Sequence, residues 1–151
     1  MGKKNKFMLK AIELSLKSAK TIGGPFGCVI VKDNKIISEG FNKVTSTNDP
    51  TAHGEIVAIR EACHKLSTFN LSGCELYSTC EPCPMCLSAT YWSHIDKIFY
   101  ANTRDDAKKI DFDDSFIYSE INKKIEDRKI QMIQMHRDEA LKAFKIWDEK
   151  V

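Results

Sequence analysis

Long hydrophobic runs and a strong excess of either charge are both missing from this chain of 151 residues. No stretch approaches the ~20 apolar residues that a membrane-spanning helix needs, and the basic residues 1–6 are not followed by the apolar segment of a secretory signal. With 23 basic and 21 acidic side chains the net charge is only +2, which disfavours a protein that binds nucleic acid over a broad basic surface. We therefore expect a soluble cytosolic protein.

Internal repeats, linkers and low-complexity segments are also absent. A chain of this length fits one domain, which buries roughly 68–70% of the surface of its unfolded chain. The hydrophobic fraction of 42% is ordinary for a folded protein and argues against extended disorder. We expect a single domain over residues 1–151 that is stabilised by its core.

Cysteine, by contrast, is abundant for a cytosolic chain. Six are present, and four of them fall within residues 74–86. Because the cytosol keeps thiols reduced, metal binding or packing explains them better than three disulfides. The six residues are Cys28, Cys63, Cys74, Cys80, Cys83 and Cys86. The first three are expected to be small buried hydrophobic side chains, and Cys80 is expected to be structural.

Hydrophobic periodicity predicts helices and strands that alternate along the chain. Apolar residues recur at helical spacing over residues 3–22, 52–66, 82–94 and 137–151. Short β-branched or aromatic runs predict strands over residues 28–31, 35–39, 75–79, 98–100 and 130–135. This order predicts an α/β protein with a mixed five-stranded sheet that is covered by helices on both faces. Ligands of open α/β sheets bind where strands end and helices begin.

Two short motifs at predicted helix starts carry the candidate chemistry. His53 and Glu55 belong to the first motif, HGE, and Cys83 and Cys86 belong to the second, PCPMC. A catalytic zinc site takes three protein ligands and leaves one position for water, and a helix N-terminus stabilises thiolates. The sequence therefore predicts one zinc ion per chain, bound by His53, Cys83 and Cys86. Glu55 would stand beside the metal as the general base.

Two other interpretations of these residues remain open. Cys80 or Cys74 could complete a closed, structural zinc site, and the chain would then be a non-catalytic zinc module. That interpretation leaves His53 and Glu55 without a role. The Cys-Pro-Met-Cys run could also be a redox pair, although no second half of a redox fold is visible in the sequence.

The two motifs together are the signature of zinc-dependent deaminases, and the chain resembles the cytidine-deaminase-like superfamily of nucleobase and nucleoside deaminases. Residues 49–55, DPTAHGE, and 81–86, EPCPMC, resemble both its guanine deaminase and its tRNA adenosine deaminase branches. Residues 23–27, GGPFG, and 112–118, FDDSFIY, favour the guanine deaminase branch. The resemblance covers residues 6–147 and implies a CMP/dCMP-type deaminase domain with a three-layer α/β/α fold. It also implies hydrolysis of guanine to xanthine and ammonia.

The resemblance also assigns roles to residues outside the two motifs. It implies that Asp114 is a second proton carrier, which protonates the departing amine. The sequence alone also allows Asp113 and Asp114 to cap the helix that follows them. The resemblance further implies that Asn42 and Gly54 contact the purine, although an asparagine in a loop is commonly a turn residue.

Large aromatic side chains suggest two further features. Phe26 and Trp92 could form walls for the base, or they could belong to the core. The resemblance implies a homodimer in which the C-terminal helix around Phe144 and Trp147 packs on the partner or is exchanged with it.

The resemblance leaves two alternative substrates open. Because the chain ends at Val151, without the terminal aromatic residue that closes the pocket in some relatives, guanosine is one alternative. Adenosine in tRNA is the other, since the tRNA adenosine deaminase branch shares both zinc motifs. The near-neutral net charge and the acidic residues 111–114 count against a nucleic-acid substrate.

Overall fold

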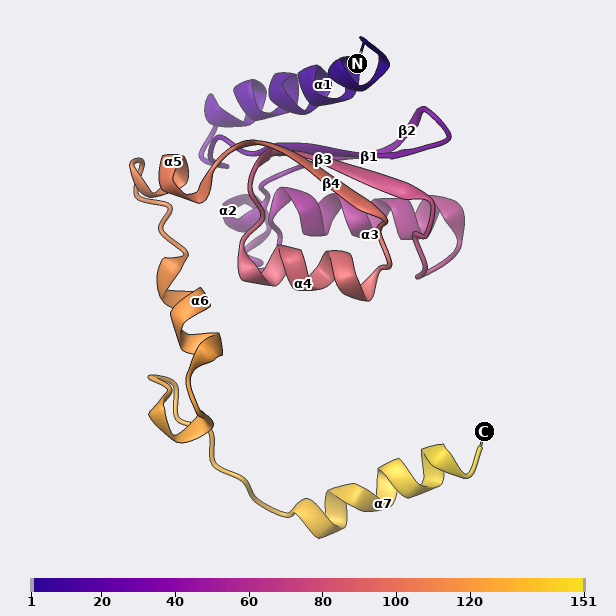
Figure 1. The fold of residues 1–151 in the computed structure, drawn as a ribbon, viewed down its shortest axis with the longest axis vertical. Coiled ribbons are helices and arrows are strands. Elements are labelled where there is room, and N and C mark those ends of the chain that lie inside the picture. The colour runs from indigo at the N-terminus through magenta and orange to yellow at the C-terminus, as the bar shows by residue number, and fades with distance from the viewer. Residues whose placement is uncertain (1, 151) are drawn as a thin grey trace. The chain divides into compact units, whose positions relative to one another are not determined.

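The structure, a computed structural model, describes residues 2–150. The chain divides into two compact units, Met1–Ser115 and Phe116–Val151, and each is described by itself. Figure 1 follows the elements along the chain. None of the helices within residues 2–150 combines the length and the apolar character needed to span a bilayer.

A four-stranded mixed sheet forms the centre of the first unit. Its strands are β1 (Gly27–Lys32), β2 (Lys35–Phe41), β3 (Cys74–Cys80) and β4 (Lys97–Asn102), in the spatial order β2-β1-β3-β4. β1 is antiparallel to both of its neighbours, and β4 is parallel to β3. The first four predicted strands are therefore confirmed. The parallel β3–β4 pair requires a crossover, and α4 (Pro84–Trp92) provides it.

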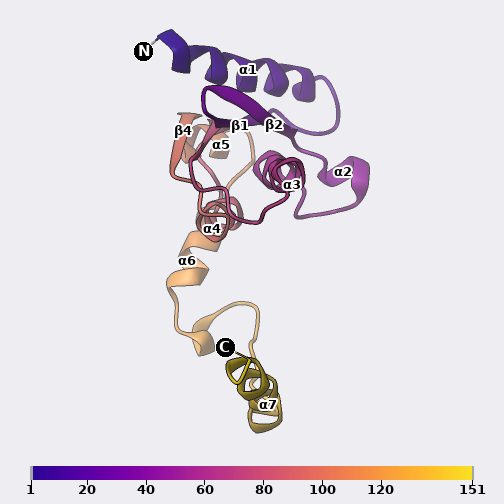
Figure 2. The same cartoon turned by 90° about the vertical axis from the view of Figure 1, so that its right-hand side faces the viewer.

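Helices cover both faces of this sheet, as Figure 2 shows. α1 (Gly2–Ala19) lies on one face, and α3 (Gly54–Leu66) and α4 lie on the other. Alternation along β1 serves both layers: Val29 and Val31 pack with α1, and Cys28 and Ile30 pack with α3. A strand that is buried on both faces is expected to be a continuous run of apolar residues, and residues 28–31 of β1, CVIV, form such a run. The predicted three-layer α/β/α architecture is confirmed.

The absence of a side chain at Gly40 allows α3 to pack closely against β2. A Cβ atom added at Gly40 would lie 2.0 Å from the carbonyl oxygen of Gly54, so no other residue fits there without moving backbone. At Gly54 itself the nearest atoms would be 3.4–3.5 Å away, which is ordinary van der Waals contact. The first turn of α3 is thereby held at the end of β2.

Short helices complete the first unit. α2 (Val44–Thr47) lies in the loop between β2 and α3, and α5 (Arg104–Lys108) follows β4. Thr103 and Asp106 form a capping box at the start of α5.

The second unit contains helices but no strand within residues 116–150. Its elements are α6, which begins one residue earlier (Ser115–Asn122), a 3₁₀ turn at Ile125–Asp127, and α7 (Arg137–Asp148). The predicted strand over residues 130–135 is wrong, and the sheet has four strands rather than five. Alternating apolar residues show only which side chains avoid water, whereas a strand also needs a neighbour to complete its hydrogen-bond ladder. Ile130 and Ile133 are 82% and 79% exposed, so this chain gives them no packed face either.

Candidate metal centre

Two helix N-termini meet at one edge of the sheet. β3 ends at Cys80, and the chain then turns through Cys83 into α4. The loop after β2 leads through His53 into α3, and α3 and α4 are in contact. His53 and Cys83 are both the residue before the first helical turn, in extended backbone conformation. Pro84 then starts α4, because its fixed φ suits the first helical position.

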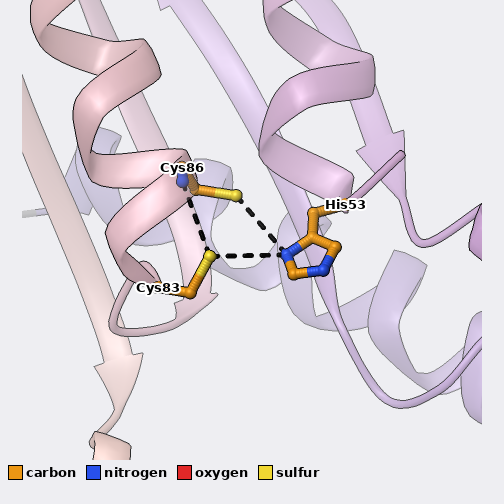
Figure 3. Close-up of side chains that lie close together, drawn as sticks. All are labelled: His53, Cys83 and Cys86. Atoms are coloured by element: carbon orange, nitrogen blue, oxygen red, sulfur yellow. Dashed lines mark hydrogen bonds between the residues drawn. The ribbon is translucent and has the colours of Figure 1, made fainter. Parts of the chain in front are cut away.

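The side chains of His53, Cys83 and Cys86 converge, as Figure 3 shows. His53 Nδ1 lies 3.5 Å from Cys83 Sγ and 3.6 Å from Cys86 Sγ. All three candidate ligand atoms lie within 4.8 Å of one another. For bond lengths of ~2.3 Å to sulfur and ~2.05 Å to nitrogen, tetrahedral zinc places its sulfur and nitrogen ligands ~3.6 Å apart. The spacing of these atoms thus fits zinc without rearrangement.

Hydrogen bonds give the two thiols opposite proton affinities. The pKa of Cys83 falls to about 4, because the Cys86 thiol, His53 and the Cys86 backbone N–H donate to its sulfur. The pKa of Cys86 is raised far above its ordinary value by its bond to Cys83, by burial and by the negative charge of Glu55. The pKa of His53 is raised, chiefly by its hydrogen bond to Cys83. A bound cation would replace these shared protons, so the donor set fits a metal that takes two thiolates and one imidazole.

Glu55 stands beside this cluster. It is buried, with 8% of its surface exposed, and its Oε1 accepts a hydrogen bond of 3.0 Å from Ser78 Oγ. Ser78 Oγ is also 2.8 Å from the carbonyl oxygen of Cys80, so the hydroxyl links Glu55 to the end of β3. Glu55 raises the pKa of Cys86 both by its charge and through a hydrogen bond. The carboxylate is thus close to the candidate ligands and fixed in orientation.

The two neighbouring aspartates differ in their surroundings. Asp113 Oδ1 accepts a 2.9 Å hydrogen bond from the backbone N–H of Ser115, the first residue of α6, which is consistent with a role at that helix start. Asp114 is half-buried, and its pKa is raised by burial and then by the charge of Cys83. Both aspartates line a pocket of about 180 Å³ together with Glu81 and Arg104, but the charge of Cys83 acts on Asp114 and is not among the causes of the Asp113 shift. Asp114 is therefore the aspartate that lies near the cluster.

Phe26 lies at the same edge of the sheet. The backbone N–H of the next residue, Gly27, donates to Thr79 Oγ1 over 3.1 Å, next to the end of β3. The Phe26 ring meets Phe112 edge to face, with centroids 4.9 Å apart. Trp92, in contrast, is the last residue of α4 and is 82% exposed, so within this chain it lies at the opposite end of that helix from Cys83.

Asn42 has a local structural partner. Its Oδ1 accepts a 2.9 Å hydrogen bond from the backbone N–H of Val44, at the start of α2. The turn role considered for this residue is confirmed, and its amide nitrogen stays available as a donor in the predicted contact with a base. Gly54, the first residue of α3, is buried against β2.

Sequence reasoning missed several supporting residues. Ser78 orients Glu55, and its signal was a hydroxyl residue in the buried part of β3. Phe112 partners Phe26, and it stood inside the quoted 112–118 segment without a role. Glu81 accepts a 3.1 Å hydrogen bond from the backbone N–H of Arg104, a contact between segments that no local pattern predicts.

Comparison with known proteins places this arrangement among deaminases. Residues 1–102 match the sequence model described as "Cytidine and deoxycytidylate deaminase zinc-binding region". The chain is 51% identical to guanine deaminase from Bacillus subtilis over 142 residues, which are 93% of this chain and 91% of the relative. It is 46% identical to the tRNA-specific adenosine deaminase of Aquifex aeolicus over 102 residues, 67% of this chain and 66% of the relative.

Solved structures give the same picture. An X-ray structure of guanine deaminase from Bacillus subtilis matches with a TM-score of 0.93 and 49% identity, covering 96% of this chain and 93% of that one. A guanine deaminase from Nitrosomonas europaea matches with a TM-score of 0.67 and 33% identity, covering 72% of this chain and 63% of that one.

Metal analysis of the purified protein should find one zinc ion per chain, because one set of three converging ligands is present within residues 2–150. Cys83→Ala removes the thiol with the lowered pKa and should reduce the zinc content to near zero. Cys63→Ala is the matched control, since that half-buried thiol packs against the core cluster that contains Cys74 and is not part of the ligand set. Full zinc content in Cys83→Ala would show that the metal is bound elsewhere.

Proposed function

Because this chain belongs to the cytidine and deoxycytidylate deaminase family of zinc enzymes, we propose that it hydrolyses guanine to xanthine and ammonia. The extent of similarity supports this substrate. The family model ends at residue 102, but the match to guanine deaminase covers 142 residues. It therefore continues beyond β4 into the region of Phe112 and Asp114. The match to the tRNA-specific deaminase covers only 67% of the chain.

His53, Cys83 and Cys86 would bind the zinc ion, and their spacing supports that role. When bound, zinc supplies hydroxide at neutral pH, because it lowers the pKa of water. Glu55 takes the proton of the attacking water and passes it to N3 of guanine while the C2–O bond forms. The hydrogen bond from Ser78 to Glu55 supports this role, since a proton carrier must be held in reach of both the water oxygen and N3 of guanine.

Asp114 would serve the other half of the reaction. The amine on C2 must gain a proton as the C2–N bond breaks, so that it leaves as ammonia. Burial and then the charge of Cys83 raise the pKa of Asp114, which favours the protonated carboxyl group that this step needs. The proton of the new hydroxyl group then returns to a carboxylate, and guanine plus water becomes xanthine plus ammonia.

Substrate contacts would come from the loops around the cluster. The amide of Asn42 would pair with the purine edge, and the backbone of Gly54 would lie against the base. The Phe26 ring, braced by Phe112, would supply an apolar wall. A cytosolic location fits this activity, and the six cysteines without disulfides support it.

We also propose that the enzyme is a homodimer, because the second unit leaves its apolar residues in water. No residue within 116–150 is buried. Phe144 and Trp147 on α7 are 73% and 69% exposed, and Ile130 is 82% exposed. An ordered helix with large exposed aromatics needs a partner surface. A second copy, on which α7 packs or with which it is exchanged, is the partner that this chain itself can supply.

Ammonia release should be fastest with guanine when guanine, guanosine, adenine, cytidine and a tRNA anticodon stem are compared. A chelator should abolish release.

Glu55→Gln should keep the zinc ion and the fold but lose ~10²–10⁴-fold in turnover, because glutamine cannot carry a proton. Faster release from guanosine or from the stem would overturn the proposed substrate, and an active Glu55→Gln would overturn the proton path.

Asp114→Asn should reduce guanine turnover by at least ~10²-fold at unchanged zinc content, since the amide has no proton to give. Because the pKa of Asp114 is raised, the wild-type rate should fall as pH rises past that pKa and the acid is lost. Asp113→Asn is the matched control and should cost only ~0.5–2 kcal/mol of stability as a weakened cap. An inactive Asp113→Asn beside an active Asp114→Asn would exchange the two roles.

Light scattering at micromolar concentration should give twice the chain mass of 17.2 kDa. Phe144→Asp combined with Trp147→Asp should shift the protein to the monomer, because charges replace the apolar side chains of α7. Glu139→Ala, on the same helix, should leave the mass unchanged. A monomeric wild type would refute the dimer.

A further inference from the structure

Three polar side chains join the loop before His53 to the body of α3. Asp49 Oδ1 accepts hydrogen bonds from the backbone N–H of Thr51 over 2.9 Å and from Thr51 Oγ1 over 2.6 Å. Arg60 then bonds to both residues: one guanidinium nitrogen lies 3.2 Å from Asp49 Oδ2, and the other lies 3.2 Å from Thr51 Oγ1. We call the set Asp49, Thr51 and Arg60 the loop clasp.

Helix geometry explains why Arg60 can close this clasp. Arg60 lies six residues after Gly54, the first residue of α3, so it is less than two helical turns from the start of that helix. Helical side chains lean toward the helix N-terminus, and the long arginine side chain therefore reaches back over the first turn. Its planar fork offers two donors in fixed geometry, which suits a carboxylate and a hydroxyl that lie next to each other.

The clasp connects to His53 through short backbone hydrogen bonds. The N–H of Ala52 donates to the Asp49 carbonyl over 3.0 Å, and the N–H of His53 donates to the Thr51 carbonyl over 2.8 Å. The His53 carbonyl then accepts from Val57 inside α3 over 3.0 Å. The side chain of His53 makes no capping hydrogen bond, so the clasp is joined to the start of α3 through these backbone hydrogen bonds.

Exposure argues that this clasp is not a stability device. The side chains of Arg60 and Asp49 are 60% and 35% exposed, and surface ion pairs contribute little to folding. The pKa of Asp49 is lowered, first by the two bonds from Thr51 and then by Arg60, so the carboxylate stays charged at neutral pH. A fully connected network around residues 49–51 restricts geometry more than it changes the free energy of unfolding.

We propose that Arg60 is a positioning residue, which acts through Asp49 and Thr51 to hold His53 Nδ1 at its distance from Cys83 and Cys86. This inference rests on the proposed role of His53 as a zinc ligand. Arg60 touches neither the substrate nor the ligand atoms. Its loss allows residues 49–53 to move, and a ligand that moves binds the metal less tightly.

The test is zinc transfer from the holoenzyme to a chromophoric chelator. Arg60→Ala should lower the zinc affinity ~10–100-fold, the usual effect of removing a residue that supports a metal ligand. Thr51→Val should do the same, and the double variant should lose no more than either single variant, because all act through one clasp. Glu61→Ala is the matched control, since it removes the neighbouring Lys65–Glu61 ion pair on the same helix.

A second readout separates positioning from general loosening. In the cobalt-substituted protein, Arg60→Ala should change the d–d bands, which depend on how His53 is placed, and leave the thiolate charge-transfer band in place. Because zinc that binds more weakly also stabilises the fold less, its thermal midpoint should match that of Glu61→Ala once a chelator has removed the metal from both proteins. Wild-type zinc affinity in Arg60→Ala, or equal losses in Arg60→Ala and Glu61→Ala, would overturn the proposal.

A last comparison keeps the two proposals apart. His53→Ala should lose zinc outright. If His53→Ala binds zinc as tightly as the wild type, the ligand assignment fails and the clasp fails with it. If His53→Ala loses zinc and Arg60→Ala does not, the clasp alone is refuted and the metal centre stands.

Discussion

The close approach of β2 to α3 is the constraint on which the site depends. With no side chain at Gly40, the carbonyl of Gly54 comes against the strand, and a Cβ atom there would lie only 2.0 Å from that oxygen. The first turn of α3 is thereby fixed at the sheet edge where β3 also ends. His53 precedes that turn and Cys83 precedes the first turn of α4, so packing between backbones brings the two motifs together. The ligand spacing follows from the fold before any metal is considered.

The layered core makes this edge rigid. β1 is buried on both faces, and β3 beside it is buried at six of its seven positions. Tyr77 stacks on Phe99 with centroids 4.6 Å apart and contacts Phe7 of α1 at 5.4 Å. Protein interiors packed in this way have discrete arrangements and do not deform continuously. The end of β3 therefore fixes the positions of Ser78 and Cys80. Because Ser78 Oγ donates a hydrogen bond to Glu55, the Glu55 side chain is held in place as well.

The sequence predicts the parts of this molecule that depend on local pattern. His53, Cys83 and Cys86 were identified from ligand chemistry and spacing, and four strands were identified from their apolar runs. The residues 130–135 failed as a strand because a ladder requires a neighbour, which the pattern of one segment does not report. The sequence leaves Trp92 open between a wall of the site and the core, because its place at the exposed end of α4 depends on how that helix packs.

Contacts between residues that are not neighbours in the chain could not be predicted from the sequence either. Arg60 is seven residues from His53, and nothing in the spacing says that its fork meets Asp49 and Thr51. Phe26 and Phe112 are far apart in the chain, and the fold alone makes them a pair. Local pattern identifies the groups that do chemistry, whereas the groups that hold them in place come from tertiary structure.

The charges at this edge of the sheet explain why the proposed zinc site and the proposed proton carrier, Glu55, depend on each other. Glu55 raises the pKa values of Cys28, Cys80 and Cys86, and Cys83 raises those of Cys86 and Asp114. Two thiolates and a buried carboxylate therefore repel one another at this edge of the sheet. A divalent cation balances the two thiolates, and the ligand set with neutral histidine then carries no net charge. Zinc bound by these residues would offset the negative charge beside Glu55, so the proposed metal site and the proposed general base depend on the same arrangement of side chains.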